Sequence, residues 1–252
     1  MYKRQRYVGR STRMTTTTAV PCLSRTPRTD ARLRLFCFHH AGGGASFFSS
    51  WADRVPPGVD VLPVQLPGRE ARYREPRFQD AGELVAALGR DLAPYLDEGP
   101  WAAYGHSMGA LVAAALAAAR LRAGGRGPGA LFLGAYAAPH LTPTLPLPDH
   151  YKDRELARLL VDFGGMDPRF LEQERARLPL VVEAFAGLDD PLVDPARVRA
   201  WERYAHDFRL TLVPGGHFFP REEPGPFFAR LNRSLARLLG EPAPVGPPAA
   251  PG

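Results

Sequence analysis

The sequence contains almost no lysine. Lys3 and Lys152 are the only lysines among 32 lysines and arginines, and 26 acidic residues leave a formal net charge of +6. Arginine spread along a chain raises the rate of encounter with an acidic macromolecule, although a coding bias toward Arg, Ala, Gly and Pro gives the same composition. No nucleic-acid-binding motif accompanies the charge, so we expect no nucleic-acid partner.

Cysteines and long apolar runs are also scarce. Cys22 and Cys37 cannot by themselves form a disulfide framework or a metal site, so we expect reduced thiols, no metal and a cytoplasmic location. The apolar run from Leu111 to Leu121 has about half the length that a membrane span requires. The basic start of the chain is followed by threonines rather than an apolar segment, so we expect neither a signal peptide nor membrane attachment.

The 252 residues suit one globular domain flanked by a polar leader and a proline- and glycine-rich tail. Residues 1–32 are basic and threonine-rich without a sustained period, which predicts a disordered leader, and Met14 is an alternative start. The segment 241–252 is rich in proline and glycine, which favours an extended tail. The predicted domain is therefore 33–240.

Strand-like and helix-like patterns alternate within this domain. Asp80 stands where it can cap the first helix, and Gly124 and Gly125 end the second. Strands separated by helices predict an α/β fold with a mostly parallel central sheet and helices on both faces. The strands are predicted at 32–38, 59–66, 101–105, 129–139, 181–187 and 209–216, and the helices at 78–96, 108–125 and 224–239.

A Gly-x-Ser-x-Gly pattern joins the strand at 101–105 to the helix that follows. In a nucleophile elbow the serine lies on a strained turn, and Gly105 and Gly109 remove side chains that would collide with the neighbouring strand or helix. The pattern predicts Ser107 as a nucleophile. A plain Gly-Ser turn without chemistry is the alternative.

A serine nucleophile needs a base, and the base needs an orienting acid. In this architecture the chain order is serine, acid, histidine, which points to His217 in "PGGHFF". "AGLDDPLVD" offers the acid. We prefer Asp190, with Asp189 as the fallback, and interpret the neighbouring aspartate as solvated or capping the turn.

The oxyanion of a tetrahedral intermediate needs backbone N–H donors. We expect one from Met108, after the nucleophile, and one from Ala41 in the glycine-rich loop "FHHAGGGASFF". A phosphate-binding loop is the competing interpretation, but the Gly-Lys-Ser/Thr sequence is absent and the spacing fails.

Five stretches together resemble the type II thioesterases of polyketide and nonribosomal-peptide assembly lines, which are members of the α/β-hydrolase superfamily. They are "LFCFHHAGGGASFF", "VLPVQLPGRE", "YGHSMGALVA", "AGLDDPLV" and "PGGHFF". The resemblance implies a Ser107–His217–Asp190 triad and a small helical lid. It also implies hydrolysis of acyl thioesters on the phosphopantetheine arm of acyl or peptidyl carrier proteins, which clears stalled or wrongly primed chains. We expect no cofactor, and a monomer.

The sequence departs from the family pattern at three places. His39 replaces a proline before the oxyanion loop, and "GAYAAP" at 134–139 lacks a polar and a basic residue. Between Leu178 and Val182 the chain lacks a helix and loop that the family carries before the acid strand. The lid is predicted at about 143–178. It carries candidate channel-lining residues Leu159, Leu160, Phe163, Met166 and Phe170, which could equally pack the lid on the body.

Two other functions stay open. One is an ester hydrolase or lipase for free small molecules. The other is a non-catalytic carrier-binding protein, in which the shortened segment has disabled turnover. The intact set of serine, histidine and aspartate argues against the second.

Overall fold

A six-stranded sheet forms the centre of the computed structural model, which describes residues 22–78, 80–141 and 177–241. Within these residues every pair of neighbouring strands is parallel, and the order is β2-β1-β3-β4-β5-β6. The order reverses between β1 and β3, where α/β proteins form sites at the carboxyl ends of their strands. The strands are β1 (Leu33–Phe38), β2 (Val59–Val64), β3 (Trp101–His106), β4 (Ala130–Gly134), β5 (Leu178–Gly187) and β6 (Ala205–Val213).

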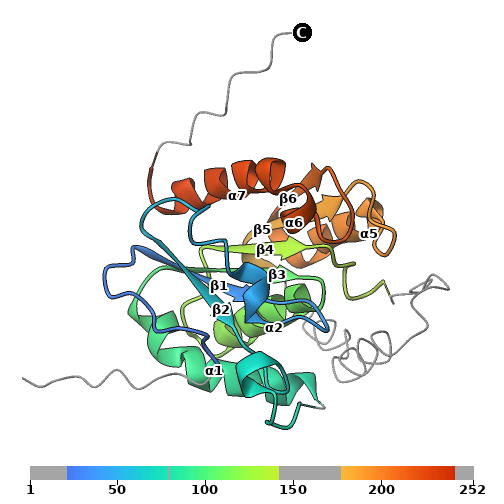
Figure 1. Ribbon diagram of the computed structural model, residues 1–252. Coiled ribbons are helices and arrows are strands. Elements are labelled where there is room, and N and C mark those ends of the chain that lie inside the picture. Colours follow the sequence, from blue (N-terminus) through green and yellow to red (C-terminus); the bar gives the residue numbers. More distant parts are fainter. Residues whose placement is uncertain (1–21, 79, 142–176, 242–252) are drawn as a thin grey trace, which may run out of the picture.

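Helices cover both faces of the sheet, as Figure 1 shows. On one face, α1 (Ala81–Glu98) and α2 (Met108–Arg122) pack against one set of strand side chains, and on the other α7 (Pro224–Leu238) packs against the alternate set. Burial on both faces explains the nearly continuous apolar strands. The predicted α/β architecture is confirmed.

Local sequence sets where the first two helices begin. The Asp80 side chain accepts a hydrogen bond from the Glu83 backbone N–H, so it caps α1 as predicted. The alanine-rich helix α2 is buried from Met108 to Ala118, which matches its apolar character on all sides. Its small side chains let the helix lie close to the sheet, and its first residue directly follows Ser107.

Several strand boundaries differ from the prediction. β4 ends at Gly134 rather than at residue 139, because Ala135 has a φ of 51° that breaks the extended backbone. β5 begins at Leu178, three residues earlier than expected, with an irregular register between Leu178 and Val181. β6 begins at Ala205, four residues earlier than expected, so His206 lies in this strand.

The prediction of a disordered leader up to residue 32 is wrong for residues 22–32. Leu23 forms an antiparallel bridge with Val64, and the Gln65 N–H donates to the Cys22 carbonyl over 2.8 Å. The Arg25 guanidinium pairs with the fully buried carboxylate of Asp60. These contacts cover the edge of β2, a need that the local sequence pattern does not reveal.

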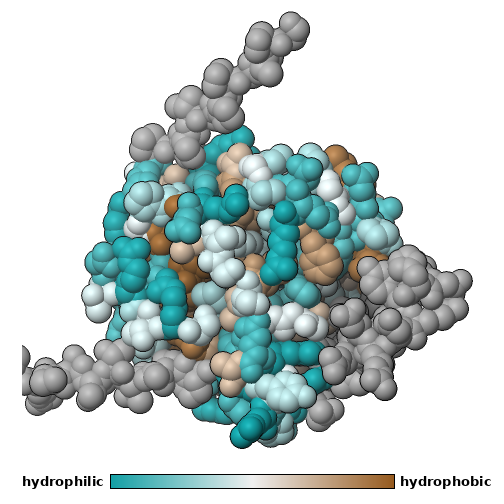
Figure 2. Space-filling view, viewed as in Figure 1, coloured by the Kyte–Doolittle hydropathy of each residue, from teal (hydrophilic) through white to brown (hydrophobic). Residues whose placement is uncertain are grey.

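The predicted leader, tail and lid lie largely in parts of the chain that the structure does not describe. Leader residues 1–21, tail residues 242–252 and all of the predicted lid except its last two residues lie outside the described residues. The described part resumes at Arg177, and β5 is paired with β4 and β6 on its two sides. The strand before Asp190 is therefore formed despite the shortened sequence. Over the described residues, hydrophilic side chains cover most of the face in Figure 2.

Candidate active site

Ser107 occupies the turn between β3 and α2. Its backbone has φ 53° and ψ −123°, a strained conformation for a residue with a side chain. The Ser107 N–H donates to the Gly134 carbonyl over 2.7 Å, which ties the turn to the end of β4. Ser107 as a whole is only 6% exposed. The geometry is that of a nucleophile elbow at the carboxyl end of a central strand.

The two flanking glycines allow the turn to pack closely. A Cβ atom on Gly105 would lie 2.1 Å from the Gly109 carbonyl oxygen, and one on Gly109 would lie 2.1 Å from the Phe38 carbonyl oxygen. Both distances are far below van der Waals contact. The glycines therefore let α2 start directly against β3 and against the end of β1.

His217 follows β6 and reaches Ser107 across the ends of the strands. Its Nε2 atom lies 3.1 Å from Ser107 Oγ, a distance over which the serine hydroxyl can donate to the imidazole. The preceding residue is fixed by its own contact, because the Gly216 N–H donates to the Glu222 carboxylate over 2.5 Å. The histidine side chain is thus placed as a general base would be.

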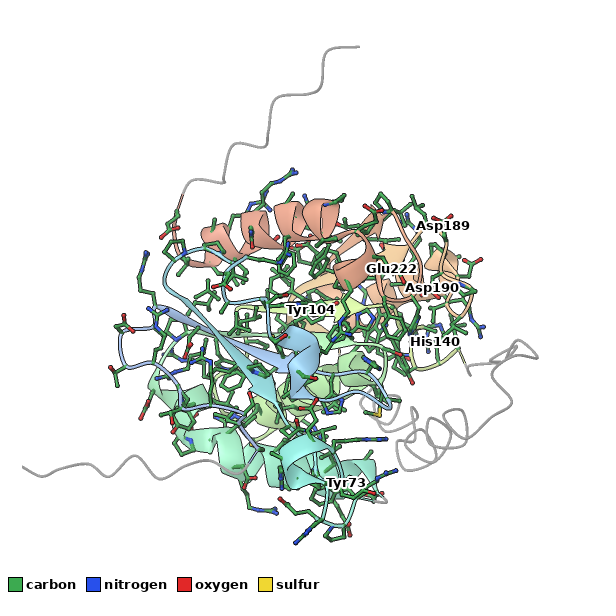
Figure 3. All side chains as sticks on the ribbon, viewed as in Figure 1. Tyr73, Tyr104, His140, Asp189, Asp190 and Glu222 are labelled. Carbon is green, nitrogen blue, oxygen red and sulfur yellow. The ribbon has the colours of Figure 1, made fainter. Side chains whose placement is uncertain are left out.

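Asp190 contacts the other nitrogen of this imidazole. His217 Nδ1 lies 2.9 Å from Asp190 Oδ2, and the carboxylate is fully buried. Its second oxygen accepts the N–H groups of Leu192 and Val193 over 2.8 and 3.1 Å. Asp189 is exposed, and its backbone N–H bonds the Gly215 carbonyl. Of the two aspartates, labelled in Figure 3, the structure brings Asp190 to His217.

A glycine lets the acid and base loops meet. A Cβ atom on Gly187, at the end of β5, would lie 2.3 Å from the Gly216 carbonyl oxygen. Gly187 starts the Gly-x-x-Asp stretch that leads to Asp190, and Gly216 precedes His217. The absence of a side chain at this position therefore brings the two loops together.

The two predicted oxyanion donors belong to segments that touch. Met108 is the first residue of α2, where backbone N–H groups lack partners within the helix. Ala41 is buried in the loop after β1, and the end of β1 lies against Gly109. Both residues are thus carried to the β1–β3 switch point beside Ser107. Their role as donors stays a prediction.

The "QLPGRE" motif holds the glycine-rich loop. The buried Gln65 side chain accepts the Ala45 N–H over 3.0 Å and donates to the Leu66 carbonyl over 3.3 Å. The Glu70 carboxylate accepts the Ser46 hydroxyl over 2.5 Å. The sequence pattern alone does not indicate which residues this motif contacts. In the structure it anchors the loop that begins at the predicted oxyanion residue.

His106 precedes the nucleophile, and the sequence pattern assigns it no catalytic role. It is fully buried, and its two ring nitrogens lie 2.8 Å from the His217 carbonyl oxygen and 2.9 Å from the Tyr104 hydroxyl. Burial, reinforced by the nearby His217 and His40, holds the pKa of His106 well below its ordinary value. The ring is therefore neutral.

His39, which replaces the proline of the family pattern, stabilises the loop in another way. Its Nδ1–H donates to the His40 carbonyl over 2.8 Å. Burial lowers the pKa of His39 to about 4, so the ring is neutral. Its Nε2 atom is buried and has no hydrogen-bond partner among the described residues. Burial also lowers the pKa of His40.

The "GAYAAP" departure forms a packing contact. The Tyr136 carbonyl accepts the Trp201 indole N–H over 2.9 Å, and the Ala138 N–H donates to the Arg197 carbonyl over 3.0 Å. These bonds join the segment after β4 to α5 (Pro195–Arg199) and η4 (Ala200–Tyr204), which follow the acid loop.

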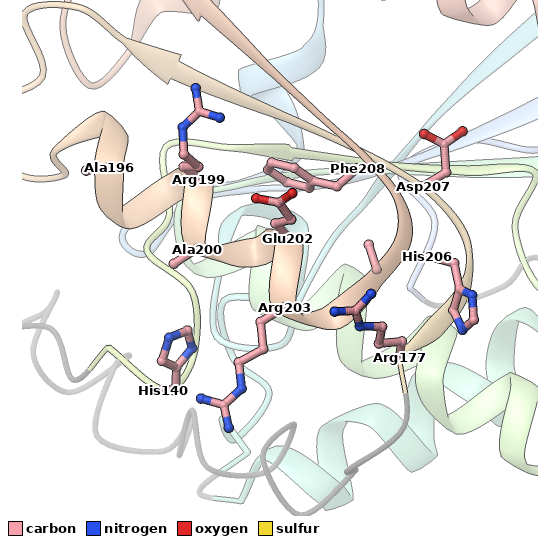
Figure 4. Close-up of a pocket in the computed structure, with 11 residues that line it drawn as sticks. His140, Arg177, Ala196, Arg199, Ala200, Glu202, Arg203, His206, Asp207 and Phe208 are labelled. Carbon is pink, nitrogen blue, oxygen red and sulfur yellow. The ribbon is translucent and has the colours of Figure 1, made fainter.

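A cavity of about 770 Å³ lies at another place in the fold. It is bordered by α5, η4 and the beginnings of β5 and β6, and its basic side chains include Arg177, Arg199 and Arg203 (Figure 4). None of the predicted catalytic residues lines it. Ser107 and His217 follow the carboxyl ends of β3 and β6, whereas this cavity lies where β5 and β6 begin.

The described ranges contain no group of three or more His, Cys, Asp or Glu side chains arranged to hold a metal ion. Within residues 22–78, 80–141 and 177–241, none of the helices combines the length and hydrophobicity needed to cross a bilayer.

The parallel sheet, the elbow and the serine–histidine contact define a hydrolase of the α/β-hydrolase class. Residues 33–186 match the family model of the thioesterase domain. The chain is 31% identical over 222 residues to thioesterase PikA5 of Streptomyces venezuelae, an alignment that covers 78% of this chain and 79% of the relative. The chain belongs to the thioesterase family.

Solved structures agree with this assignment. The RedJ thioesterase from the prodiginine pathway of Streptomyces coelicolor is 33% identical, with a TM-score of 0.70 over 80% of this chain and 86% of that one. The type II thioesterase BorB from the borrelidin cluster is 31% identical, with a TM-score of 0.69 over 89% and 99%. The predicted class is confirmed: the chain is a type II editing thioesterase of polyketide or nonribosomal-peptide biosynthesis.

Proposed function

We propose that the protein hydrolyses acyl thioesters on the phosphopantetheine arm of acyl or peptidyl carrier proteins, with Ser107 as nucleophile, His217 as general base and Asp190 as orienting acid. The observation that carries this proposal is the unbroken chain of contacts from Ser107 Oγ to His217 and from His217 to the buried Asp190 carboxylate. In the cell this reaction removes stalled or wrongly primed acyl groups.

In the acylation step Ser107 Oγ attacks the thioester carbonyl carbon while His217 Nε2 takes the hydroxyl proton. Asp190 stabilises the imidazolium that forms. The N–H groups of Met108 and Ala41 bind the oxyanion, and removing one such donor typically lowers kcat by about 100- to 1000-fold. When the tetrahedral intermediate collapses, the C–S bond breaks and the pantetheine sulfur takes the proton from His217. The product is an acyl ester of Ser107.

Water completes the cycle. His217 accepts a proton from a water molecule, whose oxygen attacks the acyl ester carbon. Collapse of the second intermediate breaks the bond to Ser107 Oγ, which regains a proton from His217. The free carboxylic acid then leaves, and the serine is ready for another acyl group.

The charge of the chain supports a carrier-protein partner. Carrier proteins of such systems are acidic, and this chain has a net charge of +6 that is almost entirely arginine. Opposite charges steer association and raise its rate more than they raise final affinity. We therefore expect carrier recognition to weaken with added salt.

Turnover of matched substrates tests the proposed function. The same acyl group is presented in three forms. These are a carrier-protein thioester, a small pantetheine thioester and an oxygen ester of a small alcohol. We expect the highest kcat/KM for the carrier thioester at low salt, with a decline at higher salt that the small thioester does not share. Preference for the oxygen ester would instead establish an ester hydrolase. Carrier binding without turnover would establish a non-catalytic protein.

A further inference from the structure

We propose that His106, the residue before the nucleophile, is a positioning residue that fixes the catalytic base by hydrogen-bonding its backbone. This inference rests on the proposed function of Ser107 and His217 and adds a residue to that site. It gives a physical reason for a histidine in the second position of the Gly-His-Ser-Met-Gly turn.

The hydrogen bonds of His106 define its protonation state. The His217 carbonyl oxygen can only accept, so His106 Nε2 carries the proton and donates over 2.8 Å. In the neutral ring Nδ1 is then an acceptor, and the Tyr104 hydroxyl donates to it over 2.9 Å. Burial lowers the pKa of His106 and raises that of Tyr104, which favours these neutral forms. Every polar atom of the two side chains is paired.

Packing holds the His106 ring in this orientation. Phe218 stacks beside it with a centroid distance of 5.8 Å, and Phe47 and Phe219 lie at 5.2 and 5.5 Å. The end of β4 leaves the necessary room, since a Cβ atom on Gly134 would lie 2.5 Å from the Tyr104 hydroxyl oxygen and 3.0 Å from His106 Nδ1. The side chain therefore has little freedom to turn away from His217.

The resulting contacts form a closed ring through the two central catalytic residues. His106 is covalently joined to Ser107, its side chain bonds the His217 backbone, and the His217 side chain returns to Ser107 Oγ over 3.1 Å. Because Ser107 directly follows His106 at the end of β3, a movement of the His217 loop away from the serine must break the bond to His106. A misplacement of about 1 Å in a catalytic group can cost about 100-fold in rate, so this bond protects kcat.

The bond differs from those that merely join two elements of the core. The buried Glu183 carboxylate, for comparison, binds Arg230 and Ser234 of α7 and contacts none of the predicted catalytic residues. The partner of His106 is the backbone of the base itself. Loss of His106 is therefore expected to change catalysis by folded molecules and not only the fraction that folds.

Two amide variants separate these roles. In His106→Gln the amide N–H can take the place of Nε2–H and reach the His217 carbonyl, whereas in His106→Asn the shorter amide can take only the place of Nδ1 beside Tyr104. We expect the Asn variant to lose about 10- to 100-fold in kcat with KM nearly unchanged, and the Gln variant to recover most of that loss. Concentrations of folded protein are set by circular dichroism and gel filtration.

The same variants are assayed for the rate at which a fluorophosphonate labels Ser107. This reaction needs the base but no carrier protein, so it tests the positioning role even if carrier thioesters prove not to be substrates. Ser234→Ala serves as the control, because it removes a buried hydrogen bond in α7 and should leave kcat and labelling per folded molecule unchanged. Equal kcat and labelling rates for wild type and His106→Asn would overturn the proposal, and so would an equal loss in the Gln and Asn variants.

Discussion

At the scale of single residues, the two adjacent aspartates show how burial separates a catalytic candidate from its neighbour. Asp190 is enclosed, receives two backbone N–H groups and touches His217, whereas Asp189 is exposed. Two backbone N–H groups and the imidazole hold the Asp190 carboxylate in one orientation, directed at the proposed base. Adjacency in sequence gives Asp189 neither this burial nor this contact with His217.

We predict that Asp190→Asn lowers kcat for acyl-carrier hydrolysis by about 10⁴-fold. An amide neither stabilises the imidazolium that forms nor holds the neutral imidazole in the tautomer that can accept the serine proton. Asp189→Asn should stay within a few-fold of wild type. Steady-state hydrolysis by the two purified variants at equal folded concentration checks the pair. A larger loss of kcat in the Asp189 variant would contradict the assignment of Asp190 as the orienting acid.

Residue types and spacing predicted Ser107, His217 and Asp190, because nucleophile, acid and base have a fixed chain order in this fold. The role of His106 was not predictable in this way. Its partner is the carbonyl of a residue 111 positions away, and that distance is set by tertiary structure alone. A buried histidine in a core has no sequence signature that reveals which backbone group it binds.

At the scale of elements, the glycine-rich loop after β1 depends on a second loop for its shape. Gln65 and Glu70, which follow β2, bind Ala45 and Ser46 within the loop. Glycines give such a loop the freedom to expose backbone N–H groups but do not fix one conformation. The side chains from the neighbouring loop supply that restriction.

We predict that Gln65→Leu lowers kcat about tenfold with little change in KM, since a buried Ala45 N–H loses its partner and the predicted oxyanion loop relaxes. Glu75→Gln is the matched control, because the exposed Glu75 carboxylate lies on the same loop and pairs with Arg72 rather than with the glycine-rich loop. Hydrolysis rates and thermal unfolding are measured for both. If Gln65→Leu lowers the unfolding temperature but leaves kcat unchanged, the loop does not contribute to catalysis.

The order of strands and helices could be predicted from apolar periodicity, capping and glycine punctuation, as the Asp80 cap of α1 illustrates. The boundaries that depend on tertiary contacts could not be predicted from these local patterns. His206 lies in β6 because β5 pairs with that segment, and residues 22–32 are fixed because they cover the edge of β2. Neither partner is visible in a local window of sequence.

At the scale of the whole molecule, buried neutral histidines couple the stability of the fold to pH. Burial lowers the pKa of His39 from 6.5 to about 4 and that of His106 well below its ordinary value. Below pH 6.5 these histidines therefore bind protons in the unfolded chain but stay neutral in the folded chain. Their contribution to stability is complete above the unfolded pKa and is lost as pH falls toward the folded pKa.

We predict that the free energy of unfolding decreases by about 2 kcal/mol between pH 6.5 and about pH 5 through His39 alone, with His106 acting in the same direction. Urea unfolding at the two pH values measures the change. His39→Asn keeps a donor for the His40 carbonyl but does not titrate, so its pH dependence should be smaller by the His39 share. Identical pH dependence in variant and wild type would refute this assignment.

The central claim is that Ser107 carries the acyl group of a carrier thioester. The most direct measurement is hydrolysis of an acyl-carrier protein by wild type and by Ser107→Ala, with intact-mass analysis of the enzyme during turnover. The account predicts an acyl adduct on wild-type enzyme, no adduct on the variant, and a loss in kcat of about 10⁶-fold in a variant that folds normally. Turnover of the Ser107→Ala variant near the wild-type rate would contradict it.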